Sequence, residues 1–158
     1  MAYRNYRNLE ASLIDYITAQ LTADGWTGIR TEKVFAEVYK NGATLPCICV
    51  GVEESDAISR EIGSKSYLEN ILVSVRIFAT SDGQRLDLAS WMLSKIMAGF
   101  NYYEYVITSG VVSSKTLAGG ITILETTANR KELKNTENLD AIDRYRHVLT
   151  FKMRVSTF

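Results

Sequence analysis

The segment ILVSVRIFATSDGQRLDLASWMLSKIMAG, residues 71–99, decides the fold, because its apolar pattern changes from the period of a strand to that of a helix. Its first part places branched side chains on one face of an extended chain, at Ile71, Val73, Val75 and Ile77. Ser81 and Gln84 then match a capping box, in which the Ser81 side chain accepts from the Gln84 amide and the Gln84 side chain reaches back to Ser81. We therefore predict a strand over 71–80 that runs directly into a helix.

The helix that follows Ser81 has an apolar stripe at the spacing of helical turns. The residues expected to be buried are Leu86, Ala89, Leu93, Ile96 and Met97, with Trp91 and Met92 beside them. Gly99 stands where a residue in the left-handed conformation commonly ends a helix.

A second amphipathic helix is predicted upstream, over Leu9–Ala23, with Asn8 as its N-cap and Gly25 just beyond its end. The segment 26–40 fits one or two short strands that end at a turn. After Pro46, the segment Cys47–Glu53 alternates branched residues with small or polar ones, and we expect it to form a long hairpin with 71–80. The polar segment 54–67 is expected to be a mobile connection within this hairpin.

Two further strands are predicted downstream, over Tyr102–Ile107 and Ile121–Thr126, linked by a segment rich in serine and glycine. The polar segment 129–140 has almost nothing to bury, so we expect a second mobile connection there.

From Tyr145 to Val155 apolar and polar residues alternate, which predicts a half-buried strand. An unbroken strand from Tyr145 to Phe158 would extend about 45 Å at roughly 3.3 Å per residue. A globule of this chain length has a radius of gyration of only about 15 Å. We therefore expect the strand to cross the whole domain or to project past it. A projecting strand would offer unpaired backbone groups to a neighbour.

Together these elements predict one α+β domain over residues 1–158, with a mostly antiparallel sheet and two amphipathic helices packed on one face. The 18 basic and 18 acidic side chains cancel, so no overall charge draws the chain to nucleic acid or to an anionic membrane. No segment approaches the roughly 20 apolar residues that span a bilayer, and the N-terminus lacks the apolar run of a signal peptide. We expect that the chain is synthesised in the cytoplasm and that it does not associate with a membrane.

Residue types that perform catalysis are sparse. The one histidine, His147, lies on the apolar face of the last strand and is expected to be a core or interface residue bonded to a backbone group. Cys47 and Cys49 are expected to be free, buried thiols, because a bridge between residues two apart in a strand is strained. The serines lack a GxSxG context, and no glycine-rich loop precedes a helix to hold phosphate. We therefore expect no enzyme activity, no cofactor and no metal site.

Eight residues are candidates for a subunit interface. The basic face of the last strand has Arg144, Arg146, Lys152 and Arg154, which could meet phosphate; pairing with carboxylates of a neighbouring strand or subunit is favoured. Tyrosines are enriched at protein interfaces, which adds Tyr103 and Tyr105. Ile58 and Ile62 complete the set as apolar residues inside the polar segment 54–67.

The order of elements resembles that of the tail terminator or neck (tail-completion) proteins of tailed bacteriophages. In that family an N-terminal helix precedes a proline-led strand like LPCICVGVEE, and a strand like LENILVSVRIFAT runs directly into a helix like SDGQRLDLASWMLSKI. A long alternating strand like YRHVLTFKMRV closes the chain. The similarity extends from Leu9 to Val155 and is one of arrangement, since the family has no catalytic motif.

This resemblance implies a structural virion protein of the tail or neck, whose copies form a ring, commonly a hexamer. Such a ring ends the growing tail tube and joins it to the connector at the head, and DNA passes through it without being read. The implied partners are other copies of the chain, the tail tube protein and the neck or connector protein.

Three other functions stay open from the sequence. Another head-tail joining or adaptor protein would use the same edge-strand contacts. A small enzyme with a dispersed site would require a pocket of titratable groups with displaced pKa values. A nucleic-acid-binding module would use the basic face of the last strand.

Overall fold

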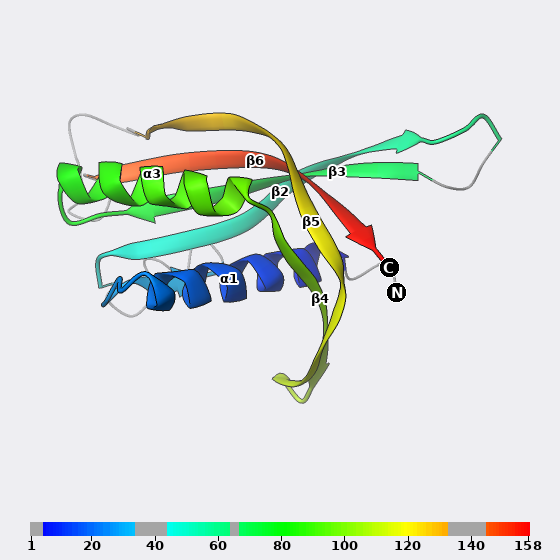
Figure 1. Ribbon diagram of the computed structural model, residues 1–158, viewed down its shortest axis with the longest axis horizontal. Coiled ribbons are helices and arrows are strands. Elements are labelled where there is room, and N and C mark those ends of the chain that lie inside the picture. The colour runs from blue at the N-terminus through cyan, green and yellow to red at the C-terminus, as the bar shows by residue number, and fades with distance from the viewer. Residues whose placement is uncertain (1–4, 34–43, 64–66, 133–144) are drawn as a thin grey trace.

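The computed structural model of the chain describes residues 5–33, 44–63, 67–132 and 145–158 (Figure 1). Its strands are β1 (Arg30–Glu32), β2 (Cys47–Ser59), β3 (Tyr67–Phe78), β4 (Phe100–Thr108), β5 (Val111–Lys131) and β6 (Arg146–Thr157). They form one sheet in the order β1-β2-β3-β6-β5-β4. Among these described strands, β1 and β2 pair in parallel and all other neighbours pair antiparallel.

Helices α1 (Asn5–Ala23) and α3 (Asp82–Met97) share one hydrophobic core with one face of this sheet. The helices contribute Leu9, Leu13, Ile17, Leu21, Leu88, Ala89, Met92 and Ile96. The two central strands contribute alternate residues, Ile71, Val73, Val75, Ile77, Leu149, Phe151 and Met153. The predicted α+β class, with a mostly antiparallel sheet and two helices on one face, is confirmed.

The start of α3 follows the predicted capping box with one difference. Ser81 is the N-cap, and its Oγ accepts from the backbone N of Gln84 at 3.2 Å. The Gln84 side chain extends past Ser81 to Thr80, whose backbone N and Oγ1 each donate to Gln84 Oε1 at 2.8 Å. At the other end Gly99 has a φ of 76° and donates to the Ile96 carbonyl, as predicted.

The buried face of α3 is turned relative to the prediction. Leu86 and Met97, which were expected to be buried, are exposed. Arg85 lies in the buried stripe in their place, because its guanidinium contacts His147 of β6. A charged residue with a partner in the sheet thus helps set the orientation of the helix, which an apolar pattern cannot reveal.

Helix α1 begins earlier than predicted. It starts at Asn5, so Asn8 lies inside the helix with a buried side chain and is not the N-cap. At the other end Gly25 has a φ of 77°, and its backbone N donates to the Thr22 carbonyl at 3.3 Å. The backbone N of Trp26 donates to the Leu21 carbonyl at 2.9 Å. These two bonds are a Schellman motif, which ends the helix before Gly25 as predicted.

β2 and β3 form the predicted long hairpin, but much of the polar segment 54–67 is strand and not a connection. β2 continues through Ser59, and its residues 54–59 pair with residues 67–72 of β3 after a bulge between Val52 and Glu54. Pairing satisfies the backbone of this segment while its side chains stay largely in water, so the polar composition concealed the strand. Residues 64–66 lie outside the described residues.

β4 and β5 form a second hairpin where a linker was predicted. Its turn is Ser109-Gly110, with φ values of 53° and 80°, the left-handed pair that a two-residue type I′ turn requires. Because β5 spans Val111–Lys131, the serine- and glycine-rich segment is strand. Residues 129–131 of the predicted mobile connection are strand as well, and 133–144 lie outside the described residues.

β6 is a central strand that crosses the sheet, which is the first of the two predicted alternatives; it does not project from the domain as the second would require. It pairs with β3 from Arg146 to Met153 and with β5 from His147 to Thr157. Both faces are buried over residues 146–151, so the strand is not half-buried as its alternation suggested. Its length is accommodated because β3 and the still longer β5 lie alongside it. Beyond Met153 the sheet divides: β6 stays with β5, and β2 and β3 continue as a separate pair (Figure 1).

Gly119 marks a close approach of β5 to β6. A Cβ built at Gly119 would overlap the backbone carbonyl of Ser156, whereas one at the next residue, Gly120, would meet nothing within 4 Å. We predict that Gly119→Ala lowers the free energy of unfolding by about 1–3 kcal/mol, the usual effect of overpacking, and that Gly120→Ala lowers it much less. Urea unfolding of both variants measures the difference, and equal losses would contradict the close approach.

Candidate functional site

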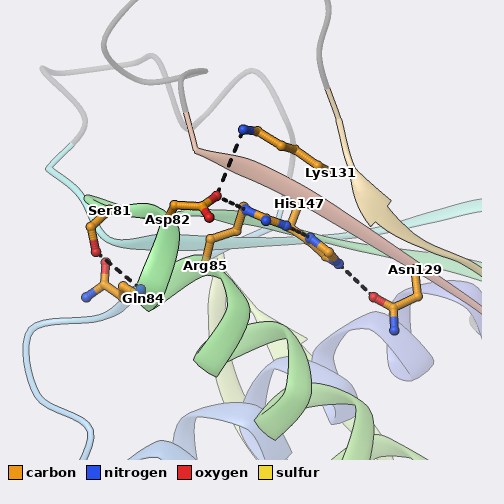
Figure 2. Close-up of polar contacts among 7 residues, drawn as sticks. All are labelled: Ser81, Asp82, Gln84, Arg85, Asn129, Lys131 and His147. Carbon is orange, nitrogen blue, oxygen red and sulfur yellow. Dashed lines mark hydrogen bonds and ion pairs between the residues drawn. The ribbon is translucent and has the colours of Figure 1, made fainter.

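A polar cluster with buried Arg85 and His147 at its centre joins the start of α3 to β5 and β6 (Figure 2). Arg85 Nη1 lies 2.6 Å from His147 Nδ1, and His147 Nε2 lies 2.6 Å from Asn129 Oδ1. On its other side Arg85 Nε donates to Asp82 Oδ1 at 2.9 Å. Lys131 Nζ lies 3.9 Å from the same Asp82 oxygen. The cluster therefore connects a helix and two strands through side chains alone.

The chemistry of these contacts fixes the protonation of His147. A guanidinium can only donate, so Nδ1 must accept from Arg85, and Nε2 has the proton that is donated to Asn129. Burial and then the charge of Arg85 lower the pKa of His147 below its ordinary value. His147 is thus neutral near pH 7 with both ring nitrogens engaged, an arrangement that suits holding α3 to the sheet. Its predicted backbone partner is wrong, because both partners are side chains.

Cys47 and Cys49 are free thiols on the opposite face of the sheet, beside Phe78. Burial raises the pKa of both thiols, that of Cys49 to about 12. The prediction of free, buried thiols is confirmed. No three His, Cys, Asp or Glu side chains of residues 5–33, 44–63, 67–132 and 145–158 gather as a metal site requires. Neither α1 nor α3, the helices of the described segments, is long and apolar enough to cross a bilayer.

The basic side chains of β6 have acceptors in their own chain. Lys152 Nζ lies 3.6 Å from Glu125 Oε1, on the neighbouring strand β5. Arg154 donates to Asn70 Oδ1 from Nε at 3.2 Å and from Nη2 at 2.7 Å, which bridges β6 to β3 where the sheet divides. These contacts are of the strand-to-strand kind that the sequence favoured over phosphate binding.

Arg146 is the one described member of this basic set that is fully buried, at 2% exposure. Its Nε lies 2.8 Å from Glu132 Oε2, and its guanidinium lies 5.2 Å from the centre of the Phe78 ring. Arg146 is thus enclosed within its own chain, and the structure gives it no exposed side chain for the predicted subunit contact. Arg144 lies outside the described residues.

The outer edge of β4 is covered by side chains of α1. Ser12 Oγ accepts from the backbone N of Tyr103 at 3.0 Å, and Asn8 Oδ1 accepts from the backbone N of Tyr105 at 3.4 Å. Asn8 and Ser12 are both buried. Backbone groups that an edge strand would offer to another chain are occupied here, so this edge does not invite strand addition.

Two pairs of strands extend beyond the helices as arms (Figure 1). We call residues 53–63 and 67–70 the β2–β3 arm; there the two strands pair only with each other among the described residues. We call residues 103–117 the β4–β5 arm, in which β5 has not yet met β6. Exposed apolar side chains gather on the arms: Ile58, Ile62 and Tyr67 on the first, and Val106, Val111, Val112 and Leu117 on the second. Of the predicted contact residues that the structure describes, Ile58 and Ile62 are the most exposed.

A groove of about 290 Å³ lies between α1 and the β4–β5 arm. It is lined by Arg7, Asn8, Ala11, Ile14, Asp15, Lys33, Tyr105, Ile107, Val112 and Lys115. Tyr105 is a buried wall of this groove, and its hydroxyl donates to Asp15 Oδ2 at 2.7 Å. Lys115 Nζ lies 2.8 Å from the same carboxylate and 4.2 Å from the centre of the half-buried Tyr103 ring. The sequence indicated the two tyrosines, but no local signal joins Arg7, Lys33 and Val112, which come from three separate segments.

No family model and no curated protein matches the chain. Among solved structures, it is similar to a chain described as "Virion of native gene transfer agent (GTA) particle". The similarity has a TM-score of 0.51 at 15% sequence identity and covers 98% of both chains. At this identity the likeness shows a shared fold, and it extends over nearly the whole length of each chain.

The neutral state of His147 makes stability depend on pH. Its folded pKa lies below the ordinary 6.5, so the unfolded chain binds the additional proton first as the pH falls. We predict that this contribution is present above about pH 6.5 and is lost as the pH falls toward the folded pKa. Urea unfolding at pH 7.5 and 5.5 measures it: because the chain has one histidine, His147→Gln should remove part of the pH dependence. An unchanged slope would contradict the assigned neutral state.

The hydrogen bonds from the β4 edge to α1 side chains also give a testable prediction. Ser12→Ala leaves the partly buried backbone N–H of Tyr103 without its acceptor, which should lower the free energy of unfolding by about 1–3 kcal/mol. Thr22→Ala is the matched control, since that exposed hydroxyl bonds only to a carbonyl of its own helix. Urea unfolding compares the two, and a loss no larger than that of the control would show that Ser12 does not protect the edge.

Proposed function

We propose that the chain is a structural subunit of a phage-like virion and has no catalytic activity. The observation that supports this most directly is the fold that it shares, over 98% of both chains, with a chain of a gene transfer agent virion particle. A protein that works by assembly requires surfaces that remain exposed in its own fold. The two arms, with apolar side chains in water on both, are such surfaces.

The finer role that we propose is that of a tail terminator, whose copies form a hexameric ring at the end of the tail tube. In this role the ring joins the tube to the neck or connector protein and is part of the finished virion. A ring follows when a surface of one copy binds a different surface of the next and the rotation closes. The β2–β3 arm and the groove are different surfaces of one chain, so the fold has what a head-to-tail contact requires.

DNA that passes through such a ring must not be retained by it. Lys152 and Arg154, the partly exposed basic residues of β6, already contact Glu125 and Asn70. The chain has no net charge. Both features favour passage over binding, since affinity for duplex DNA depends on basic side chains that are free to neutralise phosphates.

The test is the state of the purified chain in solution and on tubes. We predict an oligomer by light scattering, with a central opening in negative-stain images, either alone or after tail tube protein is added. Tubes assembled with the chain should stop at a defined end with a ring on it. A strictly monomeric chain in both conditions would contradict the proposal.

Another head-tail joining or adaptor protein is the alternative closest to this role. The same images separate the two, because a terminator lies on the end of the tube and an adaptor lies on the head connector without tubes. Duplex binding that falls steeply with salt would instead favour a nucleic-acid-binding module.

A further inference from the structure

We propose that the β2–β3 arm of one copy binds in the groove between α1 and the β4–β5 arm of the next copy. This inference rests on the proposed function and deepens it, because it assigns the surfaces that would join neighbours. The occupant of the groove is thus a second copy of this chain, bound head to tail.

The groove can accept an apolar side chain that has charged residues beside it. The apolar part of its lining comes from Ala11 and Ile14 of α1 and from Ile107 and Val112 of the β4–β5 arm. At about 290 Å³ it is large enough for one or two branched side chains and too small for a folded element. The backbone edge of β4 beside it is already occupied by Asn8 and Ser12, so the contact is made by side chains and not by an added strand.

The β2–β3 arm presents side chains of the matching kind. Ile58 is 60% exposed near the end of β2, and Ile62 is fully exposed in the segment after it. Burial of such residues in a neighbour's groove removes apolar surface from water that the chain's own fold leaves exposed. The β4–β5 arm also has exposed valines, but Val112 of that arm is itself part of the groove wall.

The charges of the β2–β3 arm and of the groove are complementary, which supports binding of one to the other. The described part of the β2–β3 arm has five carboxylates, Glu53, Glu54, Asp56, Glu61 and Glu69, and one cation, Arg60. The groove is lined by three cations, Arg7, Lys33 and Lys115, and one carboxylate, Asp15, which Lys115 already pairs. Among the described residues no hydrogen bond or ion pair is made by Arg7 or Lys33, although the charge of Lys33 acts on the nearby carboxylates of Glu10 and Asp15. On the arm, Glu54, Asp56 and Glu61 likewise make no hydrogen bond or ion pair with a described residue. An acidic apolar arm and a basic apolar groove would each complete the other.

The apolar tip of the β2–β3 arm does not reach the groove of its own chain, since Ile62 is fully exposed. The base of the arm contacts α1 next to the groove, where the Tyr6 hydroxyl hydrogen-bonds to Ser55 and Glu69. No residue of the β2–β3 arm lines the groove. Figure 1 shows the arm extending away from the sheet in one direction, while α1 and the tip of the β4–β5 arm lie on another side. A contact between them therefore joins different copies through different surfaces, and repetition of that contact gives a ring or an open filament.

Cross-linking tests which surfaces meet. One chain has Ile62→Cys, a second has Ala11→Cys, and each is oxidised alone and after mixing, with tube protein present. The native Cys47 and Cys49 are buried thiols with raised pKa values and should not compete. We expect cross-linked dimers only in the mixture. The control replaces Ile62→Cys by Leu86→Cys, an exposed site on α3 that lies on neither surface, and should give no dimer with Ala11→Cys.

Three outcomes of this experiment overturn the inference. Dimers from Ile62→Cys alone would indicate arm-to-arm contact. A wild-type chain that assembles into rings while the mixture gives no cross-link would leave the proposed function standing and reject this interface. A wild-type chain that stays monomeric with tube protein present contradicts both.

Charge reversal gives an independent test. Arg7→Glu with Lys33→Glu alters only the groove, and Glu54→Lys with Asp56→Lys alters only the arm. Each double variant should raise the concentration needed for half-assembly by roughly tenfold or more, because like charges then meet in the contact. Mixing the two variants should restore assembly, since each acidic surface then finds a basic one in alternating copies. Unfolding curves that match the wild type exclude misfolding, and failure of the mixture to recover would count against the proposed pairing.

Discussion

The pairing of β6 on both of its sides is the constraint on which the rest of the structure depends. Without it, β2 with β3 and β4 with β5 would be two separate hairpins, and an isolated pair of strands is marginally stable in water. With it, Ile71 meets Met153 on one side and Ile121 meets Val155 on the other, so one continuous face is available to both helices. The core then includes residues from nearly every element of the described chain.

Because β6 is enclosed by neighbouring strands, its buried polar side chains require hydrogen-bonding or charged partners. A strand in the centre of a sheet buries both faces, and this one places Arg146 on one face and His147 on the other. Each is matched by a partner on β5 or just after it, Glu132 for Arg146 and Asn129 for His147. Breaking either contact would leave a buried polar group without its partner, so these interactions specify how β5 lies on β6 more than they add net stability.

The parts of the fold that could be predicted from the sequence are those whose signal is local. Strand β3, the cap at Ser81 and the ends of both helices at glycine follow from neighbouring residues, and the structure has them. The position of β6 could not be predicted in this way, since alternation of side chains is the same for an edge strand and a central one, and its arginines resembled an exposed face. The inward position of Arg85 depends on His147, which is distant in the sequence.

Some residues of the candidate site could likewise be predicted from the sequence, and others could not. Ile58 and Ile62 could be chosen from the sequence because isolated apolar residues in a polar segment can be recognised without a structure. Both are exposed. The groove could not be predicted from the sequence, because α1, the residue after β1 and the β4–β5 arm come together only when the whole sheet has formed. The serines and glycines near the start of β5 concealed its strand for a physical reason: that part of the arm is exposed and has no core to fill.

The register shifts in β5 have a consequence for symmetry. Bulges between Ile123 and Glu125 and between Thr126 and Ala128 bend the strand opposite the middle of β6, and Figure 1 shows β5 curving strongly along its length. The direction of the β4–β5 arm relative to the β2–β3 arm is thus set inside a paired strand, not in a loop. In a closed assembly of identical copies, the angle between the two contact surfaces of each copy determines how many copies complete the circle. On the proposed contact, one residue inserted or deleted in β5 would alter the copy number without touching either surface.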